Sequence, residues 1–162
     1  MEDSVALAEK LREEGSKLAD FLSGLAEREW NVEVYTEEAT WTVKSILAHL
    51  VTAERSFLPL FEGIRNGGPG VAEDFSIDRY NARQQDKTRG LEPTVLLEAY
   101  RSTRDEMIAL VQGLGAEELE QRGRHPYLGV TTLREMVKLV YLHNQIHYRD
   151  VRRALKAVPS SS

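Results

Sequence analysis

The chain has 162 residues with 21 basic and 26 acidic side chains, a formal net charge of −5, and no cysteine. Without cysteine, the protein itself cannot supply a thiol nucleophile, an iron–sulfur cluster or a cysteine-ligated zinc site, so any metal ion must be held by His, Asp or Glu. The acidic balance, with no basic cluster longer than Arg152-Arg153, argues against a nucleic-acid partner, because binding a phosphate backbone requires a basic face.

Two long helices are predicted in the first part of the chain. From Ser4 to Leu25, apolar residues recur at every third or fourth position, which is the spacing of an amphipathic helix. After a connection over residues 28–40, a second helix is predicted from about Val43 to Gly63, with Thr42 as its N-cap. The following run Asn66-Gly67-Gly68-Pro69-Gly70 cannot continue a helix and marks the largest break in the chain.

Three more helices are predicted after this break. The segment from Ile77 to Lys87 is a short polar helix, and the segment from Pro93 to Leu114 is a longer one that begins with proline at an early helical position. Gly115 to Val130 forms a second connection. Thr132-Leu133-Arg134-Glu135 is then a capping box that starts the last helix, which runs from Leu133 to about Ala157.

These elements predict an all-α fold, an antiparallel four-helix bundle with a short extra helix in the long connection. No segment shows the period-two alternation of a strand. We expect a single domain over residues 1–158 and a disordered C-terminal tail over 159–162. The chain carries neither a signal peptide nor a membrane-spanning apolar run, so we expect a cytoplasmic protein without a membrane partner, and a homodimer formed along helix faces.

Three histidines are candidate metal ligands. His143 and His147 lie one turn apart on the last helix, so both imidazoles can reach one divalent ion at ~2.0–2.1 Å. His49, on the second helix, has small neighbours that leave room for its ring to turn toward an adjacent helix. Three neutral imidazoles would leave an open position on the ion, as in a catalytic zinc-type site. The alternative is that each histidine is a hydrogen-bonded residue of the bundle interior.

Two further polar residues interrupt the predicted core and are our catalytic candidates. Glu54 lies within the apolar stripe of the second helix, where a carboxylate needs a partner from another helix or a raised pKa. It is either a structural pair or a proton shuttle for the metal site. Asn144 lies between His143 and His147 and either orients a ligand or makes a structural hydrogen bond. His125 precedes a proline in a loop, lacks ligand spacing, and is left out of the site.

The chain resembles the DinB/YfiT-like superfamily of metal-binding four-helix bundles over nearly its whole length. The most specific parts are the segment from Trp41 to Glu54 and the C-terminal segment from His125 to His147. The stretch Asp78-Arg79-Tyr80-Asn81 is similar to a segment common in these proteins. The resemblance implies a divalent ion, with zinc or nickel expected, held by one histidine of the second helix and two of the last: His49, His143 and His147.

The resemblance also implies an activity. Relatives in this superfamily include thiol S-transferases that use bacillithiol or mycothiol, and a mycothiol-dependent maleylpyruvate isomerase. We therefore expect a metal-dependent transferase that activates a low-molecular-weight thiol for attack on a small-molecule electrophile, with Asp78, Arg79 and Asn81 at the cofactor-binding rim. The alternatives are a metal-dependent hydrolase using metal-bound water, with Glu54 taking the proton, and a non-catalytic, stress-related helical bundle.

Overall fold

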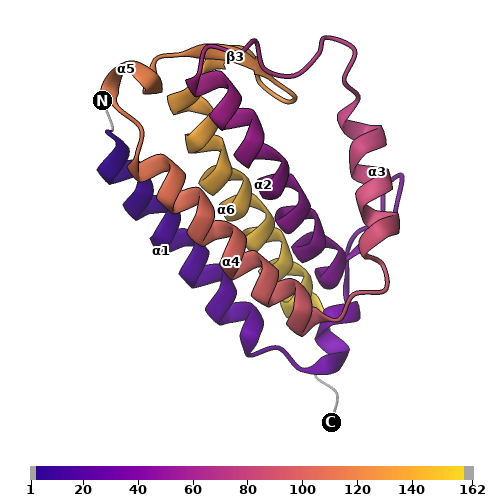
Figure 1. Ribbon diagram of the computed structural model, residues 1–162. Helices are drawn as coiled ribbons and strands as arrows, with labels where there is room; N and C mark the ends of the chain where they lie inside the picture. The colour runs from indigo at the N-terminus through magenta and orange to yellow at the C-terminus, as the bar shows by residue number, and fades with distance from the viewer. Residues whose placement is uncertain (1–2, 159–162) are drawn as a thin grey trace.

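The computed structural model describes residues 3–158, so the tail predicted over 159–162 lies outside the described residues. Four long helices lie side by side and form the bundle, and the short helix α3 lies outside it, beside α2 (Figure 1). The all-α four-helix bundle and the extra helix in the long connection are thereby confirmed. The helices are α1 (Ser4–Ser23), α2 (Val43–Arg65), α3 (Ile77–Thr88), α4 (Pro93–Gln112), α5 (Ala116–Leu119) and α6 (Leu133–Ala157).

Side-chain oxygens cap the two helices that carry the candidate ligands. Thr42 Oγ1 accepts a hydrogen bond from the amide of Ser45 at 3.2 Å, as predicted for the N-cap of α2. Thr132 Oγ1 likewise accepts from the amide of Glu135 at 3.3 Å, which is the threonine half of the predicted capping box. These caps mark where α2 and α6 begin. The start of each helix sets the position of its candidate ligands along the bundle axis.

Helix ends differ from the prediction by a few residues. α1 ends at Ser23 instead of Leu25, α2 continues past Gly63 to Arg65, and α4 ends at Gln112 instead of Leu114. The predicted ends rested on where apolar periodicity stops, and side-chain patterns locate helix termini less well than backbone hydrogen bonds do. Within the described residues, no helix is both long and apolar enough to cross a membrane.

The expectation that the chain contains no strand is wrong for the two connections, which carry short antiparallel hairpins. Each strand has two to four residues, too few for period-two alternation to show in the sequence. A 3₁₀ helix precedes the first hairpin. These elements are η1 (Glu27–Asn31), β1 (Glu33–Tyr35), β2 (Trp41–Thr42), β3 (Arg122–His125) and β4 (Gly129–Thr132).

The long connection after α2 is fastened to β3 at Gly70. This glycine has φ +92° and forms a backbone bridge with Arg124. A Cβ added at Gly70 would lie 2.3 Å from backbone atoms of Arg124, so only glycine allows this approach. The first hairpin contacts the start of α2 and also α6, and it therefore lies next to the helices that carry the candidate ligands.

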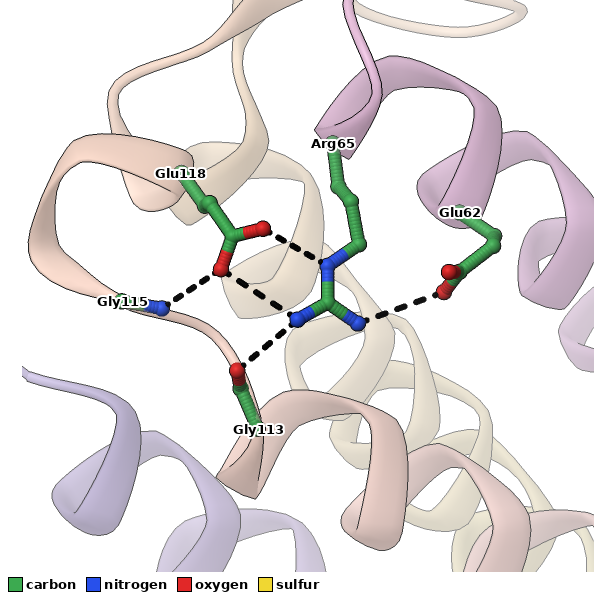
Figure 2. Close-up of polar contacts among 5 residues, drawn as sticks. All are labelled: Glu62, Arg65, Gly113, Gly115 and Glu118. Carbon is green, nitrogen blue, oxygen red and sulfur yellow. Dashed lines mark hydrogen bonds and ion pairs between the residues drawn. The ribbon is translucent and has the colours of Figure 1, made fainter.

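The end of α2 remote from His49 is held by one guanidinium. Figure 2 shows Arg65 between Glu118, Glu62 and the carbonyl of Gly113. Its Nε donates to Glu118 Oε2 at 2.8 Å and its Nη2 to the Gly113 carbonyl at 2.9 Å. Because the same carboxylate accepts from the amide of Gly115 at 2.9 Å, Arg65 joins the C-terminus of α2 to the turn between α4 and α5.

The apolar interior falls into two clusters along the bundle axis, and a buried polar layer lies near their boundary. One cluster includes Leu11, Phe61, Met107 and Met136. The other includes Leu18, Leu47, Tyr100 and Val151. Each long helix carries a buried charged or amide residue at or next to the change from one group to the other, and we call these four the Arg104 layer: Glu14, Glu54, Arg104 and Asn144.

Candidate metal centre

The structure brings His49, His143 and His147 together, and we call them the histidine triad. His49 comes from the second turn of α2, while His143 and His147 lie one turn apart on α6. Nε2 of His143 lies 3.1 Å from Nε2 of His49 and 2.9 Å from Nε2 of His147. One ring nitrogen from each residue falls within 4.8 Å of the other two. The three ring planes are nearly perpendicular to one another.

This spacing fits a shared metal ion. Nitrogens bound at ~2.0–2.1 Å to one ion are about 2.9 Å apart at right angles and about 3.4 Å apart at the tetrahedral angle. The two Nε2 distances of His143 fall within or near this interval. An imidazole nitrogen carries either a proton or a lone pair, so His143 Nε2 cannot donate to one neighbour while accepting from the other. A cation at the centre would accept all three lone pairs.

Burial keeps the triad neutral at ordinary pH. It lowers the pKa of His143 to about 4, and burial together with the neighbouring His143 lowers the pKa of His147 to about 3. The pKa of His49 is also lowered well below its ordinary value, first by burial and then by the two nearby imidazoles. Neutral imidazole is the form that binds a metal ion, so near pH 7 no proton needs to leave these residues first.

Two aromatic residues of the first hairpin contact the triad. The indole of Trp41 packs against the ring of His49 with a centroid distance of 5.0 Å. The hydroxyl of Tyr35 lies 3.0 Å from Nδ1 of His147 and donates to Asp150 Oδ2 at 2.5 Å. Burial and the hydrogen bond to Asp150 raise the pKa of Tyr35, so this hydroxyl keeps its proton at neutral pH.

Sequence reasoning missed Tyr35 and Asp150 as neighbours of the triad. Asp150 lies three residues after His147 and therefore on the same helix face, which is a signal that the sequence contains. Tyr35 falls in a segment interpreted as a connection without periodicity, and only the pairing of β1 with β2 brings it to α6. Trp41 lies within the segment that carries the family resemblance, but its contact with His49 was not anticipated.

Glu54 meets an arginine from another helix. Arg104 of α4 donates from Nε and Nη2 to the two carboxylate oxygens of Glu54, both at 2.8 Å. Its Nη1 donates to the carbonyl of Leu11 at 2.8 Å. Burial alone would lower the pKa of Arg104, but the Glu54 carboxylate raises it, so the guanidinium stays charged. This is the partnered arrangement that the sequence required of Glu54, whose role as a proton shuttle stays a prediction.

Asn144 belongs to the same layer. Its Oδ1 accepts from Arg104 Nη2 at 3.0 Å and from the hydroxyl of Tyr100. Its Nδ2 is buried and has no hydrogen-bond partner among the described residues. Asn144 therefore makes the structural hydrogen bonds that were one of the two alternatives, and its catalytic role also stays a prediction.

A cleft of about 750 Å³ lies near the triad, although none of the three histidines lines it. It lies between the first hairpin, the start of α2, and α3, and Tyr35 and Trp41 form part of its wall. Of the three predicted rim residues, Asp78 and Asn81 line this cleft. Arg79 is outside its lining, and its amide donates to Ser76 Oγ at the start of α3. The hairpin that touches the triad thus also bounds the space where a small molecule fits.

His125 has a different role. Its Nδ1 accepts from the amides of Tyr127 at 3.0 Å and Leu128 at 3.2 Å, and its ring packs against Phe57. It therefore closes the turn between β3 and β4, and it is not one of the grouped ring nitrogens among the described residues. Its location in a turn agrees with leaving it out of the ligand set.

Comparisons by sequence identify one family. A model of the DinB superfamily matches residues 10–151 of the chain. A comparison with curated proteins found no match.

Solved structures share this fold over most of the chain. YfiT from Bacillus subtilis, described as a probable metal-dependent hydrolase, has 14% identity and a TM-score of 0.78, covering 94% of this chain and 86% of its own. ClbS, a colibactin self-resistance protein solved in complex with double-stranded DNA, has 14% identity and a TM-score of 0.78 over 96% of this chain and 97% of its own. A mycothiol-dependent maleylpyruvate isomerase has 15% identity and a TM-score of 0.73, and the match covers 93% of this chain but 63% of the isomerase.

At these identities the similarity establishes the fold alone. The complex with DNA is a property of ClbS. Because a protein of this fold is found with DNA, the fold itself does not support the expectation, based on charge, that this chain has no nucleic-acid partner.

Proposed function

The chain belongs to the DinB superfamily, and from that premise we propose that it is a metal-dependent transferase that activates a low-molecular-weight thiol. The observation that carries the proposal is the grouping of three neutral imidazole nitrogens, next to two aromatic residues that also line a cleft. In this proposal His49, His143 and His147 hold one divalent ion, zinc or nickel, because imidazole suits both metals. The thiol comes from a cofactor, since the chain contains no cysteine.

An ion held by His49, His143 and His147 would keep its full positive charge, because all three ligands are neutral, and would lower the pKa of a thiol bound to it. The chain's own residues then hold and shield the site. The indole of Trp41 packs against the ring of His49 at a tilt. In the reaction the thiolate sulfur forms a bond to the electrophilic carbon, the leaving group departs with its electron pair, and the thiol proton passes to solvent.

The cleft supplies the space for the cofactor and the electrophile. Asp78 and Asn81 face it from α3, and we propose that they contact the bound molecule, with Arg79 at the outer rim. A small-molecule substrate suits a cleft of about 750 Å³, which lies within the usual range for ligand pockets. The cytoplasmic location, the single domain over 1–158 and the homodimer remain predictions, and light scattering in solution tests the last.

A hydrolase is the second candidate, and the description of YfiT as a probable metal-dependent hydrolase supports it. In the hydrolase expected from the sequence, the ion would lower the pKa of bound water and Glu54 would take its proton. Glu54, the carboxylate expected to do so, has both oxygens engaged by Arg104, so this residue is poorly placed to accept a proton. A free thiol has a pKa of about 8.5, far below the value of about 15.7 for water, so its deprotonation depends less on a base, which is why we favour the transferase.

The test is turnover of electrophiles with and without added thiol. Protein purified without an affinity tag is loaded with zinc or nickel and assayed with bacillithiol, mycothiol or glutathione against an activated aryl halide and a panel of esters. The proposal expects thiol-dependent loss of the aryl halide that disappears in the His143→Ala variant. Ester cleavage without thiol would identify the hydrolase, and full metal content without any turnover would favour the non-catalytic bundle.

A further inference from the structure

Tyr35 and Asp150 connect the first hairpin to the triad through hydrogen bonds. The Tyr35 hydroxyl lies 2.5 Å from Asp150 Oδ2 and 3.0 Å from Nδ1 of His147. Arg149 Nε donates to the other oxygen of Asp150, Oδ1, at 3.2 Å. Both carboxylate oxygens therefore have donors beside them, so Asp150 acts as an acceptor in both contacts.

The count of protons then determines the tautomer of His147. A tyrosine hydroxyl has one proton to donate, and the short contact gives that proton to Asp150. The Tyr35 oxygen can then only accept in its contact with His147, so Nδ1 of His147 must carry the ring proton. A neutral imidazole protonated at Nδ1 has its lone pair at Nε2, and Nε2 is the atom that faces His143 in the triad.

We propose that Tyr35 and Asp150 are positioning residues that hold His147 in the Nδ1–H form and direct its Nε2 lone pair toward the shared ion. The inference rests on the proposed metal site and goes beyond it, because it assigns the affinity for the ion in part to a strand outside the bundle. Hydrogen bonds of this kind to the second ring nitrogen fix the orientation of metal-binding histidines, and their loss costs about 10–100-fold in metal affinity.

The arrangement also joins the ion to the cleft. Tyr35 and Trp41 belong to the same hairpin, both line the cleft, and each contacts one histidine of the triad. A change in the hairpin therefore reaches the orientation of His147 without any change in the helices.

The experiment measures zinc affinity by competition with a chromophoric chelator for the wild-type protein, Tyr35→Phe and Asp150→Asn. Tyr35→Phe keeps the ring and removes only the hydroxyl. Asp150→Asn introduces an amide that can donate to the Tyr35 oxygen and so allow the hydroxyl to donate to His147. The matched control is Tyr80→Phe, which removes a hydroxyl that donates to the carbonyl of Thr52 instead of to Asp150. Circular dichroism checks that every variant is folded.

We expect the dissociation constant for zinc to rise about 10–100-fold in Tyr35→Phe and in Asp150→Asn, and to change less than about twofold in Tyr80→Phe. As a second readout, ¹⁵N spectra of the metal-free protein should show His147 protonated at Nδ1 in the wild type. In Tyr35→Phe and Asp150→Asn the tautomer equilibrium of His147 should shift toward the form protonated at Nε2. An unchanged zinc affinity and tautomer in Tyr35→Phe and Asp150→Asn would overturn the inference while leaving the metal site intact. A wild-type protein that binds no zinc would instead overturn the proposed function on which the inference rests.

Discussion

The Arg104 layer and the histidine triad both place polar groups inside the bundle, but their atoms find partners in opposite ways. In the Arg104 layer a cation meets an anion, and the guanidinium also donates to a backbone carbonyl and to Asn144. In the triad three groups of the same kind face one another, with nitrogen opposite nitrogen at 2.9 and 3.1 Å. The Arg104 layer contains both donors and acceptors, whereas the histidine triad offers nitrogen lone pairs.

The difference indicates two separate contributions. Most polar atoms of the Arg104 layer have hydrogen-bond partners within the protein. Its residues should therefore contribute to the stability of the fold whether or not an ion is present. The lone pairs of three neutral imidazoles need a cation as their partner. The triad should therefore contribute to stability mainly through the ion that we propose it binds. Variants and conditions that act on one cluster should therefore leave the other's property largely unchanged, and four experiments test this separation, beginning with the largest expected effect.

Removing the cation from the Arg104 layer should cause the largest loss of stability. Arg104→Ala leaves the Glu54 carboxylate buried without its ionic partner, and breaking a buried pair in this way costs about 3–5 kcal/mol. Urea denaturation measures this difference. The matched control is Arg101→Ala on the same helix, whose exposed pair with Asp20 should contribute about 0–1 kcal/mol. Equal losses in the two variants would contradict the importance of the layer.

Removal of the metal ion should lower stability only when the triad is intact. At a free ion concentration 100 times its dissociation constant, a ligand that binds only the folded state adds about 2.7 kcal/mol to the free energy of unfolding. Chelation should therefore lower the melting temperature of the ion-loaded wild type and leave that of His49→Ala unchanged. A chelator effect of equal size in the variant would place the ion elsewhere in the protein.

The metal-free protein should lose stability as the pH falls. The folded pKa of His143 is about 4 against an ordinary 6.5, so between these values the unfolded chain binds more protons. As the pH falls, each such histidine lowers the free energy of unfolding by up to about 1.4 kcal/mol per pH unit. The stability that depends on its neutral form is fully present only above pH ~6.5. His143→Gln should show a shallower slope between about pH 6.5 and 4. An identical slope in wild type and variant would contradict the lowered pKa.

Two helical glycines should respond to alanine with opposite signs. A Cβ at Gly15 would lie 2.7 Å from Nη1 of Arg104, so Gly15→Ala should disturb the Arg104 layer and cost about 1–3 kcal/mol. At Gly63 no atom lies within 4 Å, so alanine should stabilise α2 by up to about 1 kcal/mol through its higher helix propensity. Thermal denaturation of the two variants compares them. A gain in stability at Gly15 would show that Arg104 tolerates displacement.

The sequence predicted the helices well because their apolar residues repeat over many turns, and a long repeat is visible without tertiary information. It brought His49, His143 and His147 into one hypothesis through the one-turn spacing on α6 and the family resemblance. It also required a partner for Glu54. It did not identify Arg104 as that partner, because arginine is usually exposed and the two residues are 50 positions apart.

The hairpins and their contacts could not be predicted for a related reason. β1 and β2 have three and two residues, so their pairing leaves almost no pattern in the sequence. The position of Tyr35 beside His147 depends on that pairing and spans 112 residues. Local patterns and the family resemblance therefore pointed to the three histidines, whereas their contact with Tyr35 depends on long-range pairing that only the folded structure provides.

The central claim is that three imidazoles from two helices share one ion. The most direct measurement is elemental analysis of protein purified without an affinity tag, for the wild type and for His49→Ala, His143→Ala and His147→Ala. The control is His125→Asn, which changes a buried imidazole outside the triad and keeps an acceptor for the turn between β3 and β4. We predict about one equivalent of zinc or nickel in the wild type and the control and less than about a tenth in each triad variant. Stoichiometric metal in any triad variant would contradict the claim.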